Sequence, residues 1–268
     1  MKNNIEPTQN KYLIIQADDF GMSRGINRGV IDAFQSGAAT STSLLMVVPF
    51  AEEAARLARE NPHLPVGLHL SLTNGYPILS PKEIPSLVDQ DGALMRRPEL
   101  ILPVAKSDDI VRELTAQLNR FLQYGLKLSH IDTHHDCINH PTVRKFLLDM
   151  AEKHSVPIRS LTDLEAKEEA KRRGILNPDW YDTIFTKKIP ITPSFIIEKI
   201  KSLKPGITDL GCHLGYADED LAAISSYVKE REMELESLKD KRVMETLISE
   251  GVRLIGFNNL RDIKTVLP

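Results

Sequence analysis

The stretch YLIIQADDFG, residues 12–21, is a short apolar run that ends in two adjacent carboxylates and a glycine. Further apolar runs follow it, and amphipathic stretches of helical spacing separate them, which is the pattern of repeated strand–helix units. We expect strands at Tyr12–Ala17, Ser43–Val48, Val66–Leu70, Leu128–Asp132, Val156–Arg159, Asp209–Leu214 and Val252–Phe257. We expect helices near Ile26–Ser36, Ala51–Glu60, Ile110–Tyr124, Thr142–His154, Ser194–Leu203, Glu219–Glu236 and Asp240–Glu250.

Seven strands with intervening helices predict an α/β fold in which a parallel sheet closes, or nearly closes, into a TIM-like (β/α) barrel. An open doubly wound sheet is the alternative, because periodicity does not show whether a sheet closes. Two longer irregular stretches, Thr73–Ser107 and Asn177–Pro193, are predicted to be loop insertions at the catalytic face of the barrel, since long loops usually carry function.

The composition excludes several classes of protein. The 268 residues carry a formal net charge of −3, without the basic excess of a nucleic-acid binder. Hydrophobic residues make up 41% and charged residues 26%, which excludes a largely disordered chain. No apolar run approaches the ~18 residues of a membrane-spanning helix, and Met1–Asn10 lacks the apolar core of a signal peptide. We expect a cytoplasmic protein with no membrane or nucleic-acid partner.

The first chemical signal is the pair Asp18 and Asp19 at the end of the first strand. Two adjacent carboxylates after an apolar strand are costly to bury unless they are paired or bound to metal. A turn and helix cap is the alternative. His69 follows in Val66–Leu70, where strand alternation places it opposite the apolar residues. A core histidine is the alternative there.

The fourth strand carries the densest signal, HIDTHHD at residues 130–136. His130, Asp132 and His134 share one face of an otherwise apolar strand, and such a polar row favours a metal or catalytic site. His135 and Asp136 lie just beyond it, where partners that orient a ligating imidazole usually lie.

Two further strands end in polar groups. His213 lies between glycines in the sixth strand and repeats the pattern of His69, while Arg159 ends the fifth. All these groups fall at the carboxyl ends of expected parallel strands, which form the catalytic face of a (β/α) barrel. Because the groups spread from Asp19 to His213, one sheet must enclose them, and we expect residues 1–268 to form a single domain.

One aspartate and two histidines would give a metal three protein ligands and leave positions open for water and substrate. The remaining carboxylate and histidine suit a general base and a general acid. This ligand set suits Zn²⁺, Mn²⁺, Co²⁺ or iron better than Mg²⁺, which prefers oxygen. Cys137 and Cys212 fall outside the row and are expected to be structural thiols.

The motifs together resemble the YdjC-like carbohydrate deacetylases, which include chitooligosaccharide deacetylases and are related to the NodB-type polysaccharide deacetylases. The resemblance runs from Leu13 to about Gly256 and rests on ADDFGMS at residues 17–23, GLH at 67–69, HIDTHH at 130–135, and Cys212-His213 with Gly215-Tyr216.

This resemblance implies a barrel with a divalent metal, recorded as Mg²⁺ in the family, held by Asp19, His69 and His134. It also implies Asp18 as catalytic base, His213 as general acid, an N-acetylated sugar as substrate and a homodimer. One departure concerns the pocket: Asp136 and Ile138 stand where the family commonly has histidines.

The supporting or substrate contacts are expected from His130, Asp132, His135, Arg159 and Trp180, where Arg159 would keep Asp18 ionised. Trp180, with Tyr181 and Phe185, could stack on a sugar or could simply anchor its loop. The alternatives to an N-deacetylase are an O-acetyl esterase or other amidohydrolase, and a sugar-binding protein without turnover. The charge-dense runs Glu165–Arg173 and Lys229–Lys241 are expected to be solvated helix faces.

Overall fold

The computed structural model describes residues 10–135, 137–159, 161, 163–186 and 189–266. Seven parallel strands form one sheet with the order β4-β3-β2-β1-β6-β5, and β7 pairs with the first half of β1. The strands are β1 Lys11–Phe20, β2 Ser41–Leu45, β3 Val66–Leu70, β4 Leu128–Thr133, β5 Trp180–Thr183, β6 Gly206–Cys212 and β7 Val252–Leu254. The predicted parallel α/β fold is confirmed.

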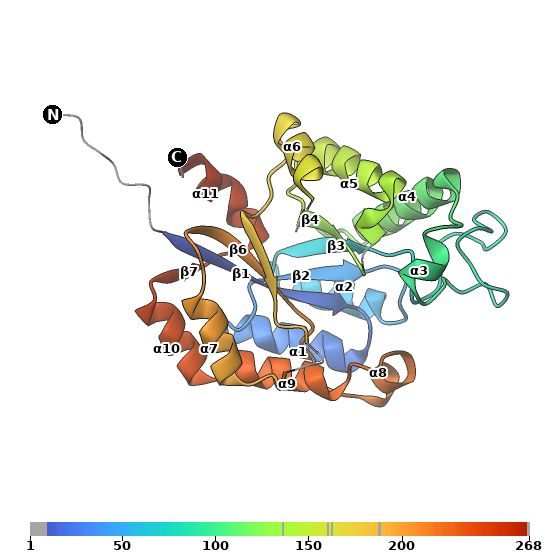
Figure 1. The fold of residues 1–268 in the computed structure, drawn as a ribbon. Coiled ribbons are helices and arrows are strands. Elements are labelled where there is room, and N and C mark those ends of the chain that lie inside the picture. Colours follow the sequence, from blue (N-terminus) through green and yellow to red (C-terminus); the bar gives the residue numbers. More distant parts are fainter. Residues whose placement is uncertain (1–9, 136, 160, 162, 187–188, 267–268) are drawn as a thin grey trace.

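Helices surround the curved sheet and lie above and below it in the view of Figure 1. The larger ones are α1 Arg24–Gln35, α2 Ala51–Glu60, α4 Ser107–Gln123, α5 Pro141–His154, α6 Leu164–Arg172, α7 Pro193–Lys201, α9 Lys229–Leu238 and α10 Lys241–Ser249. Shorter elements are α3 Pro98–Ile101, α8 Glu219–Ile224, α11 Leu260–Val266 and the 3₁₀ turns η1 Cys137–Asn139 and η2 Phe257–Asn259. None of these helices combines the length and the hydropathy that a membrane crossing needs.

The fifth strand lies elsewhere than expected. Val156–Arg159 contributes an isolated bridge, Ile131 to Ile158, whereas β5 comes from the stretch expected to be an irregular insertion. Residues 157–159 do pair with β4: Ile131 donates to the Pro157 carbonyl, and the Arg159 N–H donates to Ile131. The Ile158 N–H donates to the Leu176 carbonyl. Among the described residues, the pairing of this segment with β4 stops at the one bridge.

The sheet therefore curves around an interior with one weakly paired seam, between β4 and β5. Across that seam the described residues share the Ile131–Ile158 bridge and no ladder of their own. The other neighbouring strands are joined by parallel ladders, which shift register once between β1 and β2 and once between β3 and β4, and β1 pairs with β6 over seven residue pairs.

The inner face of the sheet is polar. Strand alternation brings four fully buried polar side chains to it, Gln16, Ser41, Ser43 and Asp209. Two glycines make room for larger neighbours: a Cβ on Gly67 would lie 2.4 Å from the His130 ring, and one on Gly211 would lie 2.4 Å from Arg159 Nη2. The larger apolar cluster lies on the outward face, where it packs against the helices.

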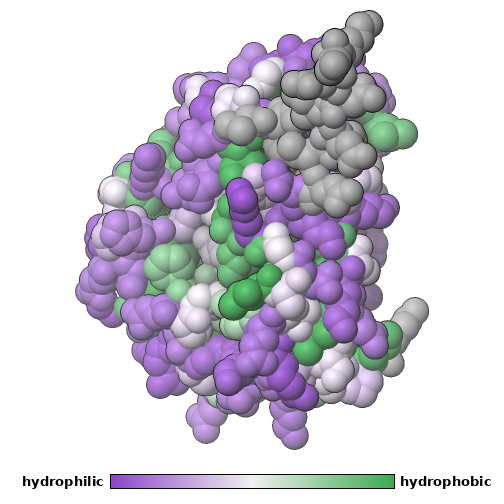
Figure 2. Space-filling view, turned by 90° about the vertical axis from the view of Figure 1, so that its left-hand side faces the viewer, coloured by the Kyte–Doolittle hydropathy of each residue, from purple (hydrophilic) through white to green (hydrophobic). Residues whose placement is uncertain are grey.

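The two ends of the sheet differ. A small apolar cluster that includes Tyr12, Ile14 and Ile207 packs around the amino ends of β1 and β6. Figure 2 shows the molecule from this side, with a band of hydrophobic residues between hydrophilic margins. The opposite, carboxyl end carries the polar residues that the sequence singled out.

The expected helix Glu219–Glu236 is two helices, α8 and α9. They are separated by Ser225, Ser226, Tyr227 and Val228, and the Ser225 hydroxyl accepts the Tyr227 N–H at 3.1 Å. This break places the first three of these residues at the carboxyl end of the sheet, where they line the cavity described next.

Candidate active site

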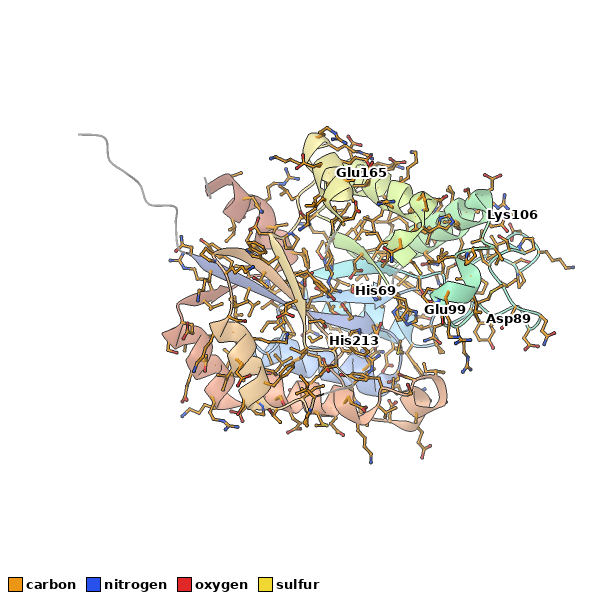
Figure 3. The ribbon with its side chains drawn as sticks, in the orientation of Figure 1. His69, Asp89, Glu99, Lys106, Glu165 and His213 are labelled. Carbon is orange, nitrogen blue, oxygen red and sulfur yellow. The ribbon has the colours of Figure 1, made fainter. Side chains whose placement is uncertain are left out.

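A cavity of about 640 Å³ opens at the carboxyl end of the sheet. Eight of the ten residues predicted for the site line it: Asp18, Asp19, His69, Asp132, His134, His135, Arg159 and His213. In Figure 3, His69 and His213 lie near the centre of the molecule, whereas Glu165, Lys106 and Asp89 lie at its margin. The convergence expected from strand ends is therefore present in the folded chain.

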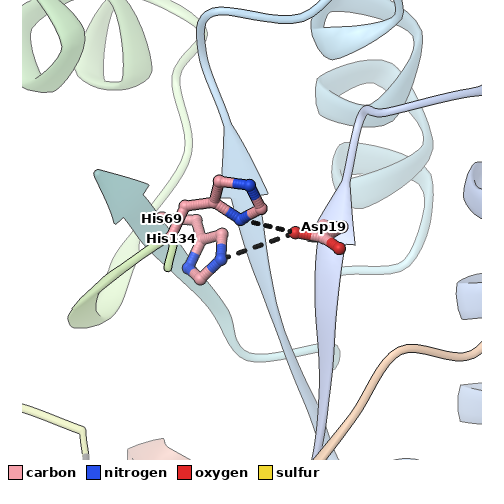
Figure 4. A group of neighbouring side chains, drawn as sticks. All are labelled: Asp19, His69 and His134. Carbon is pink, nitrogen blue, oxygen red and sulfur yellow. Dashed lines mark ion pairs between the residues drawn. The ribbon is translucent and has the colours of Figure 1, made fainter. Parts of the chain in front are cut away.

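Asp19, His69 and His134 form a compact buried cluster (Figure 4). Asp19 Oδ1 lies 3.1 Å from His134 Nδ1 and 3.6 Å from His69 Nε2, and the three candidate ligand atoms all lie within 4.8 Å of one another. Neither Asp19 Oδ1 nor His134 Nε2 has a hydrogen-bond partner among the described residues. One carboxylate oxygen and two imidazole nitrogens at this spacing fit a divalent metal ion.

The backbone of Asp19 is unusual. Its φ of 67° lies in the left-handed region, and the pairing of β1 with β2 shifts register between Ala17 and Phe20. A non-glycine residue held there costs about 1–3 kcal/mol, and such strain gathers at functional sites. The distortion allows two consecutive carboxylates, Asp18 and Asp19, to reach the same cavity instead of opposite faces of the strand.

Each oxygen of Asp19 has its own environment. Oδ2 accepts a hydrogen bond from Arg231 Nη2 at 2.7 Å, which leaves Oδ1 toward the two histidines. Burial alone would raise the pKa of Asp19, but Arg231 and His134 hold that pKa well below its ordinary value. Asp19 is therefore an ionised carboxylate, the form that binds a metal ion.

Asp132 orients His69. Asp132 Oδ1 lies 2.8 Å from His69 Nδ1, so the Nε2 atom of that ring is directed toward Asp19. A carboxylate on the remote nitrogen fixes the orientation of a metal-ligating imidazole. Burial would lower the pKa of His69, but Asp132 outweighs it and raises the pKa to about 10.

Arg159 holds Asp18. Arg159 Nη1 lies 2.5 Å from Asp18 Oδ1 and 3.1 Å from Asp132 Oδ2, while its Nε donates to Asp209 at 2.8 Å. All four side chains are nearly inaccessible to solvent. The guanidinium therefore fixes Asp18 Oδ1, and Asp18 Oδ2 lies 3.9 Å from His213 Nε2.

His213 lies one residue beyond the end of β6. Its ring packs against Phe185, with centroids 5.0 Å apart, and against Tyr227, with centroids 6.2 Å apart. Burial lowers the pKa of His213 to about 4, so the ring is neutral near pH 7. The main-chain N–H of His213 donates to Glu234 Oε2 at 2.6 Å.

His135 joins the first insertion to the site. Its ring lies 3.8 Å from that of His134, and its Nδ1 lies 2.8 Å from the Thr73 hydroxyl. Burial lowers the pKa of His135 to about 4. Asp136, predicted to lie beside it, falls outside the described residues, whereas Ile138 lines the cavity.

Two predicted residues are placed away from the cavity. His130 stacks on Phe257 at 4.0 Å, beneath the site. Trp180 lies 43% exposed along β5, where its indole donates to the Pro205 carbonyl. Its neighbours Tyr181 and Phe185 line the cavity instead.

Sequence reasoning missed Arg231 and Glu234, because the run Lys229–Lys241 was expected to be a solvated helix face, and it missed Tyr227 just before that run. That expectation is wrong for Arg231 and Glu234, which are buried in α9 and reach Asp19 and His213. Tyr227 precedes them and donates to Glu234 at 2.6 Å. The available signal was the spacing of Arg231 and Glu234, since positions three apart lie on one face of a helix.

The chain was compared with known proteins. The sequence model of the family described as "YdjC-like protein" matches residues 12–249. A carbohydrate deacetylase from Geobacillus stearothermophilus is 39% identical over 92% of this chain and 97% of that protein, and one from Thermoanaerobacter pseudethanolicus is 33% identical over 94% and 100%.

A solved structure is also similar. It is a crystal structure of a protein from Enterococcus faecalis V583 that is provisionally described as a cellobiose-phosphate cleavage protein. It superimposes with a TM-score of 0.85 at 29% identity, over 94% of this chain and 99% of that one. The arrangement of strands and helices is therefore shared along nearly the whole length of both chains.

Proposed function

Since the chain belongs to the YdjC-like family, we propose that it is a metal-dependent carbohydrate deacetylase that removes acetyl groups from N-acetylated sugars. The observation that carries the proposal is the meeting of two differently held carboxylates in one cavity. Asp19 faces two imidazoles, whereas Asp18 faces a guanidinium and His213. A site that only binds sugar has no need of an ionised carboxylate placed beside a metal ligand.

Asp19, His69 and His134 would hold the metal ion, with Asp132 and Arg231 fixing two of these ligands from behind. When bound, a divalent ion supplies Lewis acidity that polarises an acetyl carbonyl and makes a nearby water more acidic. The nitrogen-rich ligand set favours Zn²⁺, Mn²⁺ or Co²⁺, while the family resemblance favours Mg²⁺.

Asp18 would accept the proton of the attacking water. Its Oδ1 is held by Arg159, which leaves Oδ2 as the basic atom on the side of His213. A base that is held in place before substrate arrives needs little rearrangement during the reaction.

His213 would deliver a proton to the departing amine. Because burial lowers the pKa of His213 to about 4, the ring enters the reaction neutral and gains its proton during turnover. Asp18 Oδ2, 3.9 Å from His213 Nε2, lies within reach as the source of that proton. One proton would thus leave the water, pass through the site and leave with the amine.

Tyr181 and Phe185 would contact the sugar, since aromatic faces pack on the apolar faces of sugar rings and both side chains line the cavity. The volume of about 640 Å³ lies within the usual range for small-molecule sites. We propose an acetylated mono- or oligosaccharide, with or without a phosphate. The homodimer and the cytoplasmic location stay predictions.

Acetate release tests the proposal. The metal content of the purified protein is measured first, and the protein is then assayed on N-acetylglucosamine, its dimer, their phosphorylated forms and O-acetylated sugars. We expect release from N-acetylated substrates, loss of activity with a chelator, and recovery with one of the candidate metals. Asp18→Asn should abolish turnover and keep the bound metal. Full activity without metal contradicts the mechanism, and preference for O-acetyl groups favours an esterase.

A further inference from the structure

Helix α9 buries two ionisable side chains, Arg231 and Glu234, which are 3% and 0% exposed. They are three residues apart and so share one face of the helix, which is directed at the cavity. A buried charge is costly unless it is paired or hydrogen-bonded. Arg231 is ion-paired with Asp19, so the contacts of Glu234 need a separate explanation.

Glu234 binds the main chain of His213. Its Oε2 accepts the His213 N–H at 2.6 Å, at the first residue beyond β6. The N–H of the residue two positions on, Gly215, donates to the Arg231 carbonyl at 3.3 Å. Helix α9 therefore continues the support of this segment where the pairing of the strand has ended.

Glu234 also binds Tyr227, one of the two aromatic side chains that pack against the His213 ring. Its Oε1 accepts the Tyr227 hydroxyl at 2.6 Å, and the Tyr227 hydroxyl takes a further hydrogen bond from the backbone of Thr186. Tyr227 packs against Phe185 at 4.7 Å, and both rings contact His213. One carboxylate thus ties the loop after β5, the loop after β6 and helix α9 together.

The His213 ring has little else to hold it. Its Nδ1 has no hydrogen-bond partner in the part of the chain that the structure describes, and its Nε2 is 3.9 Å from Asp18. The orientation of the ring therefore depends on the main chain of His213 and on the packing of Phe185 and Tyr227. Glu234 accepts hydrogen bonds from the His213 main-chain N–H and from the Tyr227 hydroxyl.

We propose that Glu234 is a positioning residue for the reaction: it fixes the imidazole of His213 opposite Asp18 through the His213 N–H and through Tyr227. This inference rests on the proposed function, because it assigns Glu234 a role in the step that His213 performs. The inference goes beyond the proposed function because it places a residue that affects the rate on helix α9, outside the cluster of Asp19, His69 and His134.

The test compares Glu234→Ala with Glu234→Gln in the metal-loaded, full-length protein. Glutamine is of the same size and its amide can accept the His213 N–H and bind the Tyr227 hydroxyl. We expect Glu234→Ala to lower kcat about 10- to 100-fold, the effect of misplacing a catalytic group, with KM changed less than about threefold. Glu234→Gln should recover most of this loss. Glu236→Ala, exposed on the same helix, is the matched control and should equal the parent.

A double-mutant cycle separates positioning from general stability. In a His213→Ala background, Glu234→Ala should cause no further loss, because the residue it positions is gone. Losses that multiply in the double variant overturn the proposal, as does parental kcat in Glu234→Ala. If Glu234→Ala does not fold, Tyr227→Phe replaces it: the variant keeps the ring and should lower kcat about three- to tenfold, and unchanged kinetics overturn the proposal.

A measurement that does not depend on turnover separates the positioning role of Glu234 from the proposed deacetylase activity. NMR of isotope-labelled histidine reports the His213 ring, whose signals should shift and broaden in Glu234→Ala but not in Glu236→Ala. If the parent releases no acetate from any N-acetylated sugar, the proposed function fails while this measurement still decides the positioning role. Unchanged His213 signals in Glu234→Ala overturn it.

Discussion

Arg231 donates to Asp19 at 2.7 Å and so joins helix α9 to the first strand, across 212 residues of sequence. The pair is almost completely buried, at 4% and 1% side-chain exposure. Because Arg231 occupies Oδ2, the arrangement also decides which oxygen of Asp19 faces His69 and His134.

Replacing Arg231 with methionine should destabilise the metal-free protein. The change leaves a buried carboxylate unpaired, which costs about 3–5 kcal/mol. A divalent ion should restore part of this loss, since it compensates the charge of Asp19. Urea unfolding with and without metal measures both effects. Arg24→Met is the control, because the Arg24–Asp220 pair is exposed and is worth at most about 1 kcal/mol. Unfolding free energies that do not differ between Arg231→Met and the control contradict this prediction.

Asp132→Asn should weaken metal binding about 10- to 100-fold, the usual effect of losing the carboxylate behind a ligating histidine. His69 loses its fixed orientation, and Arg159 loses one of its partners. Isothermal titration with the preferred metal gives the affinity. Asp149→Asn, whose carboxylate pairs with Lys145 on α5, is the comparison and should bind metal as the parent does. Equal affinities for the two variants would exclude the orienting role of Asp132.

Glu234 should make stability depend on pH. Burial raises the pKa of Glu234 from 4.5 to about 7, against the hydrogen bonds from Tyr227 and His213, which lower it. The folded protein therefore keeps this proton between these pH values while the unfolded chain releases it, so stability falls as pH rises through that window. Relative to Glu234→Gln, the parent should lose on the order of 3 kcal/mol between pH 4.5 and 7.

Urea unfolding of both proteins at several pH values between 4 and 8 checks this. The comparison isolates Glu234 because the other titrating groups around it, including His213, Tyr227, Arg231 and Asp18, are present in both. Glu236→Gln should follow the parent at every pH. A difference between parent and Glu234→Gln that is constant with pH would show that the carboxyl titrates normally.

Substitutions of the neighbouring residues Trp180 and Tyr181 should have different effects on KM. Tyr181→Ala should raise KM for an oligosaccharide by about 10-fold, within the usual value of one aromatic contact, because Tyr181 lines the cavity. Trp180→Ala should leave KM unchanged and affect only stability, since its ring lies under Lys204 and its indole binds Pro205. Steady-state kinetics on the same substrate compare them. A larger KM effect at Trp180 would place the sugar outside the cavity.

Much of the cavity could be predicted because strand alternation is local. Gly67 and His69, or Gly211 and His213, must share a face whatever the rest of the chain does, and parallel strands bring their carboxyl ends together. The parallel α/β architecture was predicted for this reason. Asp18 shares its face with Gln16 by the same rule, whereas Asp19 reaches the cavity through the left-handed backbone and the register shift that alternation does not predict.

The remaining features depend on tertiary contacts. Helix α9 carries charge on every side, so its sequence indicates a solvated helix, and only Asp19 and His213 give Arg231 and Glu234 a reason to be buried. The strand β5 has four residues and a half-exposed pattern, which its ladder with β6 stabilises more than its own sequence does. The inward position of Tyr181 and the outward position of Trp180 follow from that ladder.

Arg159 also connects the strands on the two sides of the seam between β4 and β5. Arg159 follows the Ile131–Ile158 bridge and reaches across the interior to Asp18 on β1 and Asp209 on β6, so its ion pairs join the β4 side of the seam to two inner strands of the sheet. Amide protons at the seam should exchange through openings of lower free energy than those of β1, which has strand neighbours on both sides. Losing the charge of Asp18 would remove one of these ion pairs. A substitution that removes the proposed catalytic base would therefore also weaken the connection across the seam.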